Sequence, residues 1–271
     1  MTVPSCPVCV HPESVFVTVS LLGGEMRRCV QCGLIFRVPL WTVESSRQIG
    51  AVSAQDGDRR PTMQRVAGLL EQFKPAGGDL LDVGCAGGML FAAVRDLPTR
   101  WHLHGVEPDQ TWQDHLYPDA RVMIAPIPPC PFEGGTFEAA TVLDAIYLLP
   151  DPAAVFAELR RVLKPGGILI LDLPPQSYLR LRGFWGRLLG LSRTQAFNAY
   201  PFYFSRDSLN RLLIQNGFKL RALLPDSGIV HPTRFLRWFL RAYLGMIRPL
   251  NKLIQPTVWL APKVILVGEA Q

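Results

Sequence analysis

Short apolar runs alternate with amphipathic segments along most of the chain. Apolar runs that are bounded by glycine, proline or acidic residues predict strands at 80–83, 103–106, 121–125, 137–144, 168–172, 218–224 and 263–268. Apolar residues three and four apart, with helix start and stop signals, predict helices at 65–73, 89–96, 153–163 and 206–216. Strands that alternate with helices in this way indicate an α/β domain.

The first of these strands ends in a glycine-rich turn. The spacing Asp-x-Gly-x-x-Gly-Gly begins at Asp82 and ends at Gly88, directly before a helical pattern. Glycines let the backbone approach a ligand closely, and the free N–H groups at the helix start point into the same space. A dinucleotide fingerprint would need further glycines at Ala86 and Met89. The turn therefore predicts a cofactor of another class, and the alternative is a purely structural turn.

An acidic residue follows at the end of the next strand. Glu107 lies about twenty residues further on, where a carboxylate can accept hydrogen bonds from both hydroxyls of a ribose. With this acid, the turn closely resembles the first motif of the class I S-adenosylmethionine-dependent methyltransferases, and Pro108 and Asp109 fit the second motif of that family. The run 158–167, Glu-Leu-Arg-Arg-Val-Leu-Lys-Pro-Gly-Gly, is a further mark of the family. The resemblance covers roughly 80–173 and implies a Rossmann-like class I methyltransferase fold, with a doubly wound, mostly parallel seven-stranded sheet.

The resemblance also implies which residues hold the cofactor. The family carries an acid for the adenine amino group after the third strand, but 125–128 contains none here. The adenine is therefore expected to rest on backbone groups and on apolar side chains such as Ile127, while Asp82 fixes the turn and the methionine end. The residues expected at S-adenosylmethionine are Asp82, Gly84, Cys85, Ala86, Gly87, Gly88, Glu107, Pro108, Ile127 and Asp144.

The acceptor side of the site is expected after the fourth strand. Leu148 replaces a histidine that is frequent in the family, so no mechanism through that histidine is expected. Methyl transfer needs the nucleophile in line with the sulfonium carbon, so positioning can supply most of the rate, and a base is needed only for a weakly acidic acceptor. The catalytic or orienting candidates are Asp144, Tyr147, Tyr200 and Tyr203. A tyrosine with an ordinary pKa of about 10 is a poor base at pH 7, so we expect these tyrosines to orient the acceptor.

Four of the six cysteines lie within residues 1–40. They form two Cys-x-x-Cys pairs, which are separated by nineteen residues: Cys6, Cys9, Cys29 and Cys32. This spacing predicts a tetrahedral, structural Zn²⁺ site in a zinc ribbon, and metal binding would supply much of the folding energy of so small a unit. The alternative is two disulfides in an exported protein.

Three other segments are set apart by their composition. Residues 41–60 are polar and predict a linker or flap before a methyltransferase domain at 61–271. Residues 174–204 break the alternation of strand and helix, and we interpret them as a substrate cover or as extra core. Residues 233–254 are basic and apolar, and they are expected either to rest on a membrane surface or a lipid-linked substrate, or to pack internally.

Composition narrows the function only a little. The net charge of +6 permits nucleic acid, anionic lipid or phosphorylated partners without selecting one. The sequence shows neither a signal-peptide pattern nor an apolar run typical of a transmembrane helix, so we predict a cytoplasmic protein. Peripheral contact with the inner face of the membrane is an open alternative. We interpret the chain as a methyltransferase of small-molecule, sugar, glycan or lipid-linked acceptors, similar to bacterial zinc-ribbon methyltransferases of secondary and cell-surface metabolism. The alternatives are an RNA base methyltransferase and a catalytically silent scaffold.

Overall fold

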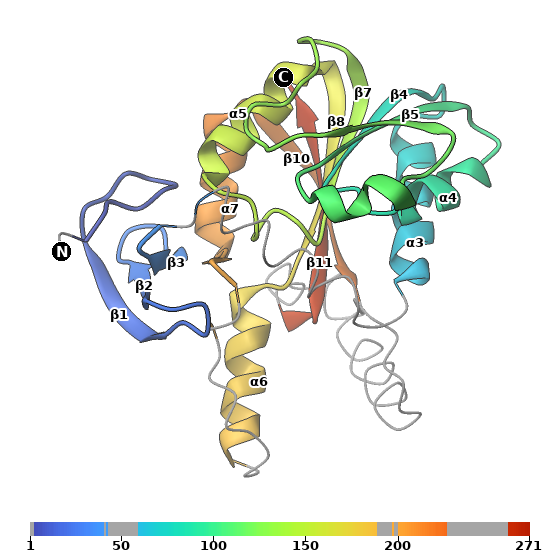
Figure 1. Cartoon of the computed structure of the whole chain (residues 1–271). Coiled ribbons are helices and arrows are strands. Elements are labelled where there is room, and N and C mark those ends of the chain that lie inside the picture. Colours follow the sequence, from blue (N-terminus) through green and yellow to red (C-terminus); the bar gives the residue numbers. More distant parts are fainter. Residues whose placement is uncertain (1–2, 41, 43–58, 189–196, 198–199, 227–259) are drawn as a thin grey trace.

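The computed structural model describes residues 3–40, 42, 59–188, 197, 200–226 and 260–271, which Figure 1 draws in colour. Most of the linker or flap predicted at 41–60, part of the segment 174–204 and all of the segment 233–254 lie outside these residues. No helix among the described residues is long and apolar enough to cross a membrane.

A seven-stranded sheet forms the centre of the molecule. Its spatial order is β10-β11-β8-β7-β4-β5-β6, and the strands from β8 to β6 are parallel, whereas β11 runs antiparallel to both of its neighbours. The strands are β4 (Gly78–Val83), β5 (Trp101–Glu107), β6 (Ala120–Ile124), β7 (Phe137–Leu143), β8 (Leu163–Leu173), β10 (Phe218–Asp226) and β11 (Lys263–Ala270). This arrangement confirms the predicted fold, a mostly parallel seven-stranded sheet.

Helices cover both faces of the sheet (Figure 1). Because successive side chains of a strand point to opposite faces, Leu80 packs with α3 (Arg60–Phe73) and α4 (Met89–Arg95). Its neighbour Leu81 packs on the other face with α5 (Pro152–Val162) and α7 (Arg206–Gln215). Both leucines are fully buried, and each such burial stabilises the fold by about 1.5–3 kcal/mol.

Helix α3 begins five residues before the predicted start at residue 65. Pro61 lies in its first turn, where a missing backbone N–H costs nothing because that group would have no partner inside the helix. Thr62 and Met63 are therefore helical and buried, and Arg59 becomes the residue that precedes the helix.

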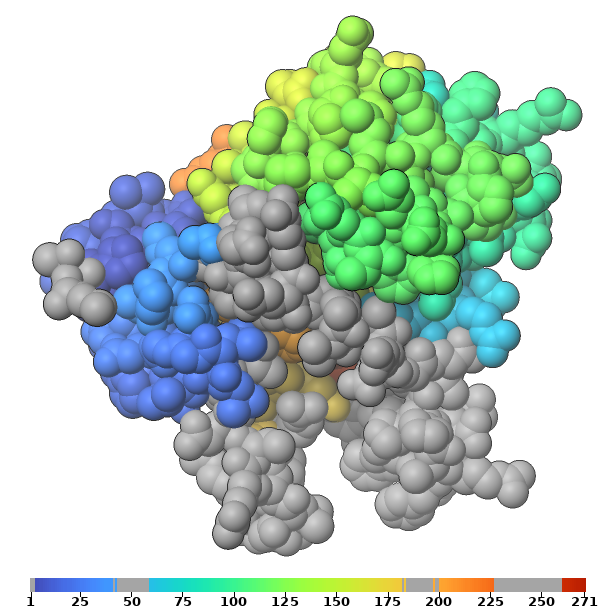
Figure 2. Space-filling model, viewed as in Figure 1, coloured from blue at the N-terminus to red at the C-terminus, as the bar shows by residue number. Residues whose placement is uncertain are grey.

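The N-terminal residues 3–40, which we call the cysteine module, form most of a second sheet among the described residues. Its strands are β1 (Ser14–Val19), β2 (Glu25–Cys29) and β3 (Ile35–Val38), and a fourth short strand, β9 (Phe202–Tyr203), completes it. Since β9 belongs to the segment between β8 and α7, the module is joined to the large domain by a shared sheet. In Figure 2 the module, in blue, forms one side of the molecule.

The remaining described elements connect these parts. Helix α6 (Gln176–Leu188) follows β8, and the 3-10 helix η1 (Gln110–His115) follows β5. Residues 174–204 thus supply a helix and a strand beside the cysteine module, and their role as a substrate cover stays a prediction.

Candidate functional site

The turn after β4 has a backbone that requires glycine at two positions. Gly84 and Gly88 have φ angles of 75° and 77°, in the left-handed region that L side chains rarely adopt. A Cβ atom at Gly84 would lie 2.8 Å from the Cβ of Ala145, and one at Gly88 would lie 2.5 Å from the Cβ of Tyr117. The spacing read from the sequence is therefore explained by backbone angles and by close packing.

Glu107 holds this turn against the next strand. Its Oε2 accepts a hydrogen bond from the backbone N–H of Ala86 at 2.9 Å, and its Oε1 accepts one from the N–H of Asp109 at 2.9 Å. Burial raises the pKa of this carboxyl, although the two N–H donors oppose the shift. The side chain is only 5% exposed, so it is available to a ligand in the adjoining cavity and hardly at all to bulk water.

A cavity of about 280 Å³ opens beside the turn. Polar groups of its wall come from the ends of β4, β5 and β7, and apolar side chains come from α3, α4, η1 and the segment after β7. Its lining residues are Arg59, Met63, Asp82, Gly84, Cys85, Ala86, Gly87, Met89, Leu90, Glu107, Pro108, Asp109, Trp112, Leu143, Asp144, Ala145, Leu148 and Leu149. A mostly apolar cleft with a few converging polar groups at the carboxyl ends of parallel strands is typical of a cofactor site.

Asp82 contributes a buried carboxyl to this cavity. Its Oδ1 accepts a hydrogen bond from the Thr141 hydroxyl at 2.7 Å. Burial raises the pKa of Asp82 to about 7, and the negative charges of Glu107 and Asp172 add to the shift. A cationic ligand group would favour the ionised form, because an opposite charge lowers the pKa of a carboxyl.

The end of β7 carries a buried cluster of charges around Asp144. The Oδ1 of Asp144 accepts hydrogen bonds from the Tyr147 hydroxyl at 2.8 Å and from the Lys263 ammonium, and its Oδ2 pairs with Arg59 at 2.9 Å. Lys263 also pairs with Asp172 at 3.1 Å, and a carboxylate oxygen of Asp172 accepts the backbone N–H of Asp144. Two carboxylates and two cations therefore balance one another beside the cavity.

The electrostatics of the cluster set its protonation states. Burial disfavours ionised Asp144, but Lys263 and Arg59 outweigh it and hold the pKa of Asp144 below its ordinary value. Burial raises the pKa of Asp172 to about 6, and it raises that of Tyr147 well above 10. At neutral pH, Asp144 is a carboxylate that accepts hydrogen bonds and Tyr147 is a neutral donor.

The three predicted tyrosines lie next to one another behind Asp144. The rings of Tyr147 and Tyr200 are 4.6 Å apart, and those of Tyr200 and Tyr203 are 5.8 Å apart. The Tyr203 hydroxyl accepts a hydrogen bond from the backbone N–H of Tyr200 at 2.9 Å. The structure thus joins four candidates from distant parts of the sequence, although only Asp144 lines the cavity.

Most of the residues predicted at the cofactor line this cavity. Two do not: Gly88 is the residue that precedes α4, and Ile127 is a buried core residue. Arg59 and Trp112 also line the cavity and Lys263 pairs with Asp144, but none of these three residues was expected at the site from the sequence. Pro61 is a helix-start signal, so it could have predicted that Arg59 precedes the N-terminus of α3, whereas no local sequence signal predicts a role for Lys263.

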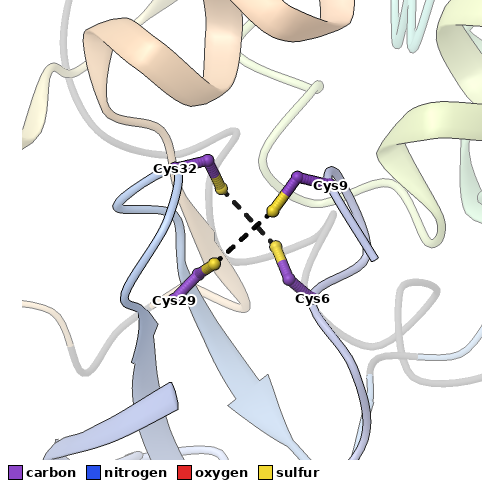
Figure 3. Close-up of side chains that lie close together, drawn as sticks. All are labelled: Cys6, Cys9, Cys29 and Cys32. Carbon is purple, nitrogen blue, oxygen red and sulfur yellow. Dashed lines mark hydrogen bonds between the residues drawn. The ribbon is translucent and has the colours of Figure 1, made fainter. Parts of the chain in front are cut away.

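The cysteine module brings its four predicted ligands together (Figure 3). The sulfur atoms of Cys6, Cys9, Cys29 and Cys32 all lie within 4.8 Å of one another, with 3.6 Å between Cys6 and Cys32 and 3.5 Å between Cys9 and Cys29. A tetrahedral Zn²⁺ with Zn–S bonds of about 2.3 Å would place its sulfur atoms about 3.8 Å apart. The four thiols therefore fit a Zn²⁺ ion, and all four are free of disulfides.

Comparisons with known proteins identify relatives of the chain. A family described as "Methyltransferase domain" matches residues 56–223. A ubiquinone biosynthesis O-methyltransferase of Xanthomonas axonopodis pv. citri is 28% identical over 43% of this chain and 53% of its own length. The corresponding protein of Xanthomonas oryzae pv. oryzae is 30% identical over 36% of this chain and 43% of its own length. The chain thus spans about half the length of the curated relatives it matches.

Solved structures support the fold. A methyltransferase from Thermotoga maritima has a TM-score of 0.51 at 18% identity, covering 85% of this chain and 99% of its own. One from Methanosarcina mazei has a TM-score of 0.51 at 15% identity, covering 74% of this chain and 96% of its own. Both are described as S-adenosylmethionine-dependent methyltransferases. With the glycine turn, the acid at the end of β5 and a family match over more than half of its length, this chain belongs to the class I S-adenosylmethionine-dependent methyltransferases.

Proposed function

We propose that this protein transfers a methyl group from S-adenosylmethionine to a hydroxyl group of a small-molecule acceptor. The observation that carries the proposal is the cavity that joins the glycine turn and Glu107 to the buried Asp144 cluster. The names of the curated relatives, ubiquinone biosynthesis O-methyltransferases, support an oxygen acceptor on a small molecule.

The residues present fit the cofactor. The carboxylate of Glu107 lines the cavity and suits the hydroxyl groups of an adenosyl ribose, and the ionised form of Asp82 suits an ammonium group. Trp112 and Leu90 supply apolar wall for a flat base. When bound, the cofactor supplies an electrophilic methyl carbon on a positively charged sulfur.

The protein's own groups would then orient the acceptor. Asp144 lines the cavity as a carboxylate, so it can accept a hydrogen bond from the acceptor hydroxyl and fix the direction of its lone pairs. Its low pKa makes it a weak base, so positioning is expected to dominate for an acidic hydroxyl such as a phenol. Tyr147 donates to Asp144 and keeps it in place, whereas Tyr200 and Tyr203 lie behind it.

A turnover screen tests this proposal. Protein incubated with S-adenosylmethionine and separate pools of phenols, sugars, lipid-linked glycans and unmodified RNA should form S-adenosylhomocysteine and a methyl ether only with a small hydroxylated pool. Asp144→Asn should lower that turnover while it preserves cofactor binding. Methylated RNA would favour the first alternative, and cofactor binding without turnover on any pool would favour the silent scaffold.

We also propose that the cysteine module holds one structural Zn²⁺ ion. The geometry of the four sulfur atoms supports it, and a site closed by four thiolates leaves no open position for catalysis. Elemental analysis should return about one zinc per chain, and protein that is isolated without metal and with two disulfides would contradict the proposal.

The predicted role of residues 233–254 remains a proposal, since they lie outside the described residues. Cosedimentation of folded, cofactor-binding protein with anionic vesicles at low salt would support peripheral membrane contact. Absence of lipid association would leave internal packing as their role.

A further inference from the structure

The cysteine module is fastened to the large domain near the acceptor end of the cavity. In the shared sheet, Ile35 and Phe36 of β3 pair with Tyr203 and Phe202 of β9. The backbone N–H of Arg37 adds a hydrogen bond to the carbonyl of Pro201 at 2.9 Å. The short strand β9 is therefore held from one side by the module, and Tyr203 is one of its two residues.

Gln176 forms side-chain hydrogen bonds both to the cysteine module and to β9. It is the first residue of α6, it is 5% exposed, and its Nε2 donates both of its hydrogens to carbonyl oxygens. One acceptor is Gly33 of the cysteine module, at 2.9 Å, and the other is Tyr203 of β9. Because both partners can only accept, the amide nitrogen must be the atom that faces them. One buried amide thus bridges the module and the strand.

A second tie lies next to the first. The hydroxyl of Ser205 donates to the backbone carbonyl of Cys32 and accepts the N–H of Ser208 at 3.0 Å, so it also caps α7. Cys32 and Gly33 are adjacent, and both of their carbonyls are therefore bonded to side chains of the large domain.

From β9, contacts continue to the cavity. The Tyr203 hydroxyl holds the backbone of Tyr200, the Tyr200 ring packs on Tyr147, and the Tyr147 hydroxyl donates to Asp144. Tyr203 and Tyr147 are buried, and Tyr200 is half-buried. A displacement of β9 would therefore be felt at the Tyr147 hydroxyl, and none of the contacts in this series involves a residue of the cofactor turn.

We propose that Gln176 is a positioning residue: by fixing β9 to the cysteine module, it sets the places of Tyr203, Tyr200 and the Tyr147 hydroxyl at the acceptor end. This inference rests on the proposed function only in taking Asp144 and Tyr147 as the acceptor end. The cysteine module is then a support for that end of the site, rather than a separate binding domain.

Fluorine NMR of the full chain labelled with 3-fluorotyrosine tests the inference. The chain has six tyrosines, and Tyr→Phe substitutions assign their signals. In Gln176→Met, which keeps the length of the side chain but removes both donors, the signals of Tyr147, Tyr200 and Tyr203 should shift or broaden. Tyr117 packs on Phe91 beside the cofactor turn and should keep its signal, so it serves as an internal reference.

The matched control is Asn216→Leu, since Asn216 also donates a side-chain amide hydrogen to a carbonyl, that of Leu212 at 2.8 Å, but at the end of α7. This control should leave the signals of the three tyrosines unchanged. Both variants should bind S-adenosylhomocysteine within about twofold of the wild type, measured by calorimetry. Unchanged signals of the three tyrosines in folded Gln176→Met, or an equal change at Tyr117, would overturn the proposal.

If Gln176→Met does not fold, Tyr203→Phe tests the next link. It removes the hydroxyl that accepts the N–H of Tyr200, so the signals of Tyr200 and Tyr147 should move, and no change in either would overturn the proposed positioning. Failure of the turnover screen with success here would refute the proposed function and leave the positioning intact.

Discussion

Replacing Glu107 by glutamine should separate the two roles of this carboxylate, which are to hold the turn and to bind the ribose. In the structure its two oxygens accept the backbone N–H groups of Ala86 and Asp109. Glutamine has one carbonyl oxygen, so one of these N–H groups would face an amide that can only donate. A buried donor left without a partner costs about 1–3 kcal/mol, and this cost falls on the free protein and the complex alike. It should therefore appear as a lower free energy of unfolding.

Loss of the second role, binding of the ribose, should appear only in the affinity for the cofactor product. A hydrogen bond to a charged acceptor contributes about 1.5–3 kcal/mol, so Glu107→Gln should weaken S-adenosylhomocysteine binding by roughly tenfold to a hundredfold. Calorimetry measures the affinity, and urea unfolding measures the stability. Glu158→Gln is the matched control, because Glu158 also accepts a backbone N–H, that of Cys130 at 2.8 Å, outside the cavity lining. Glu107→Gln protein that is folded and binds with unchanged affinity would refute the role of Glu107 at the ribose.

Three further predictions use other groups of the site and the module. Burial raises the pKa of Asp82 to about 7, and the cofactor ammonium is expected to bind its ionised form. The affinity for S-adenosylhomocysteine should therefore rise by up to about tenfold per pH unit as the pH increases towards 7, and then level off. Calorimetry should show a flatter pH profile for Asp82→Asn. Cys29→Ser should reduce the zinc content found by elemental analysis, whereas Cys130→Ser, at a buried cysteine outside the cluster, should leave it unchanged. Lys263→Met should lower the free energy of unfolding, measured in urea, by about 3–5 kcal/mol, because the buried carboxylates of Asp144 and Asp172 lose their shared cation. Adding Asp172→Asn should recover part of this loss. Equal stability of Lys263→Met and the wild type would contradict this account.

The parts of the candidate site that can be predicted from the sequence are those built from neighbours in the chain. The turn ending at Gly88 directly follows β4, and Glu107 is the last residue of β5, so their spacing from the apolar runs predicts that both lie at the same edge of the sheet. Lys263 lies 119 residues from Asp144, and nothing near it in the sequence indicates a carboxylate partner. Gln176 is similar, since its two carbonyl partners come from β9 and from the cysteine module. Pairings of this kind depend on the register of strands that meet only in the folded chain.

The strand pair β3–β9 has a consequence for the order in which the chain can fold. The cysteine module leaves the ribosome before the large domain, but Phe36 of β3, which is fully buried in the finished protein, pairs with Phe202. At about 5–20 residues per second, translation reaches β9 on the order of ten seconds later. During that interval β3 is an edge strand whose partner β9 has not yet been made, and contacts between distant residues are slow to form. A chain that stops before residue 202 would therefore carry an N-terminal sheet with an uncovered edge, prone to pairing with other chains.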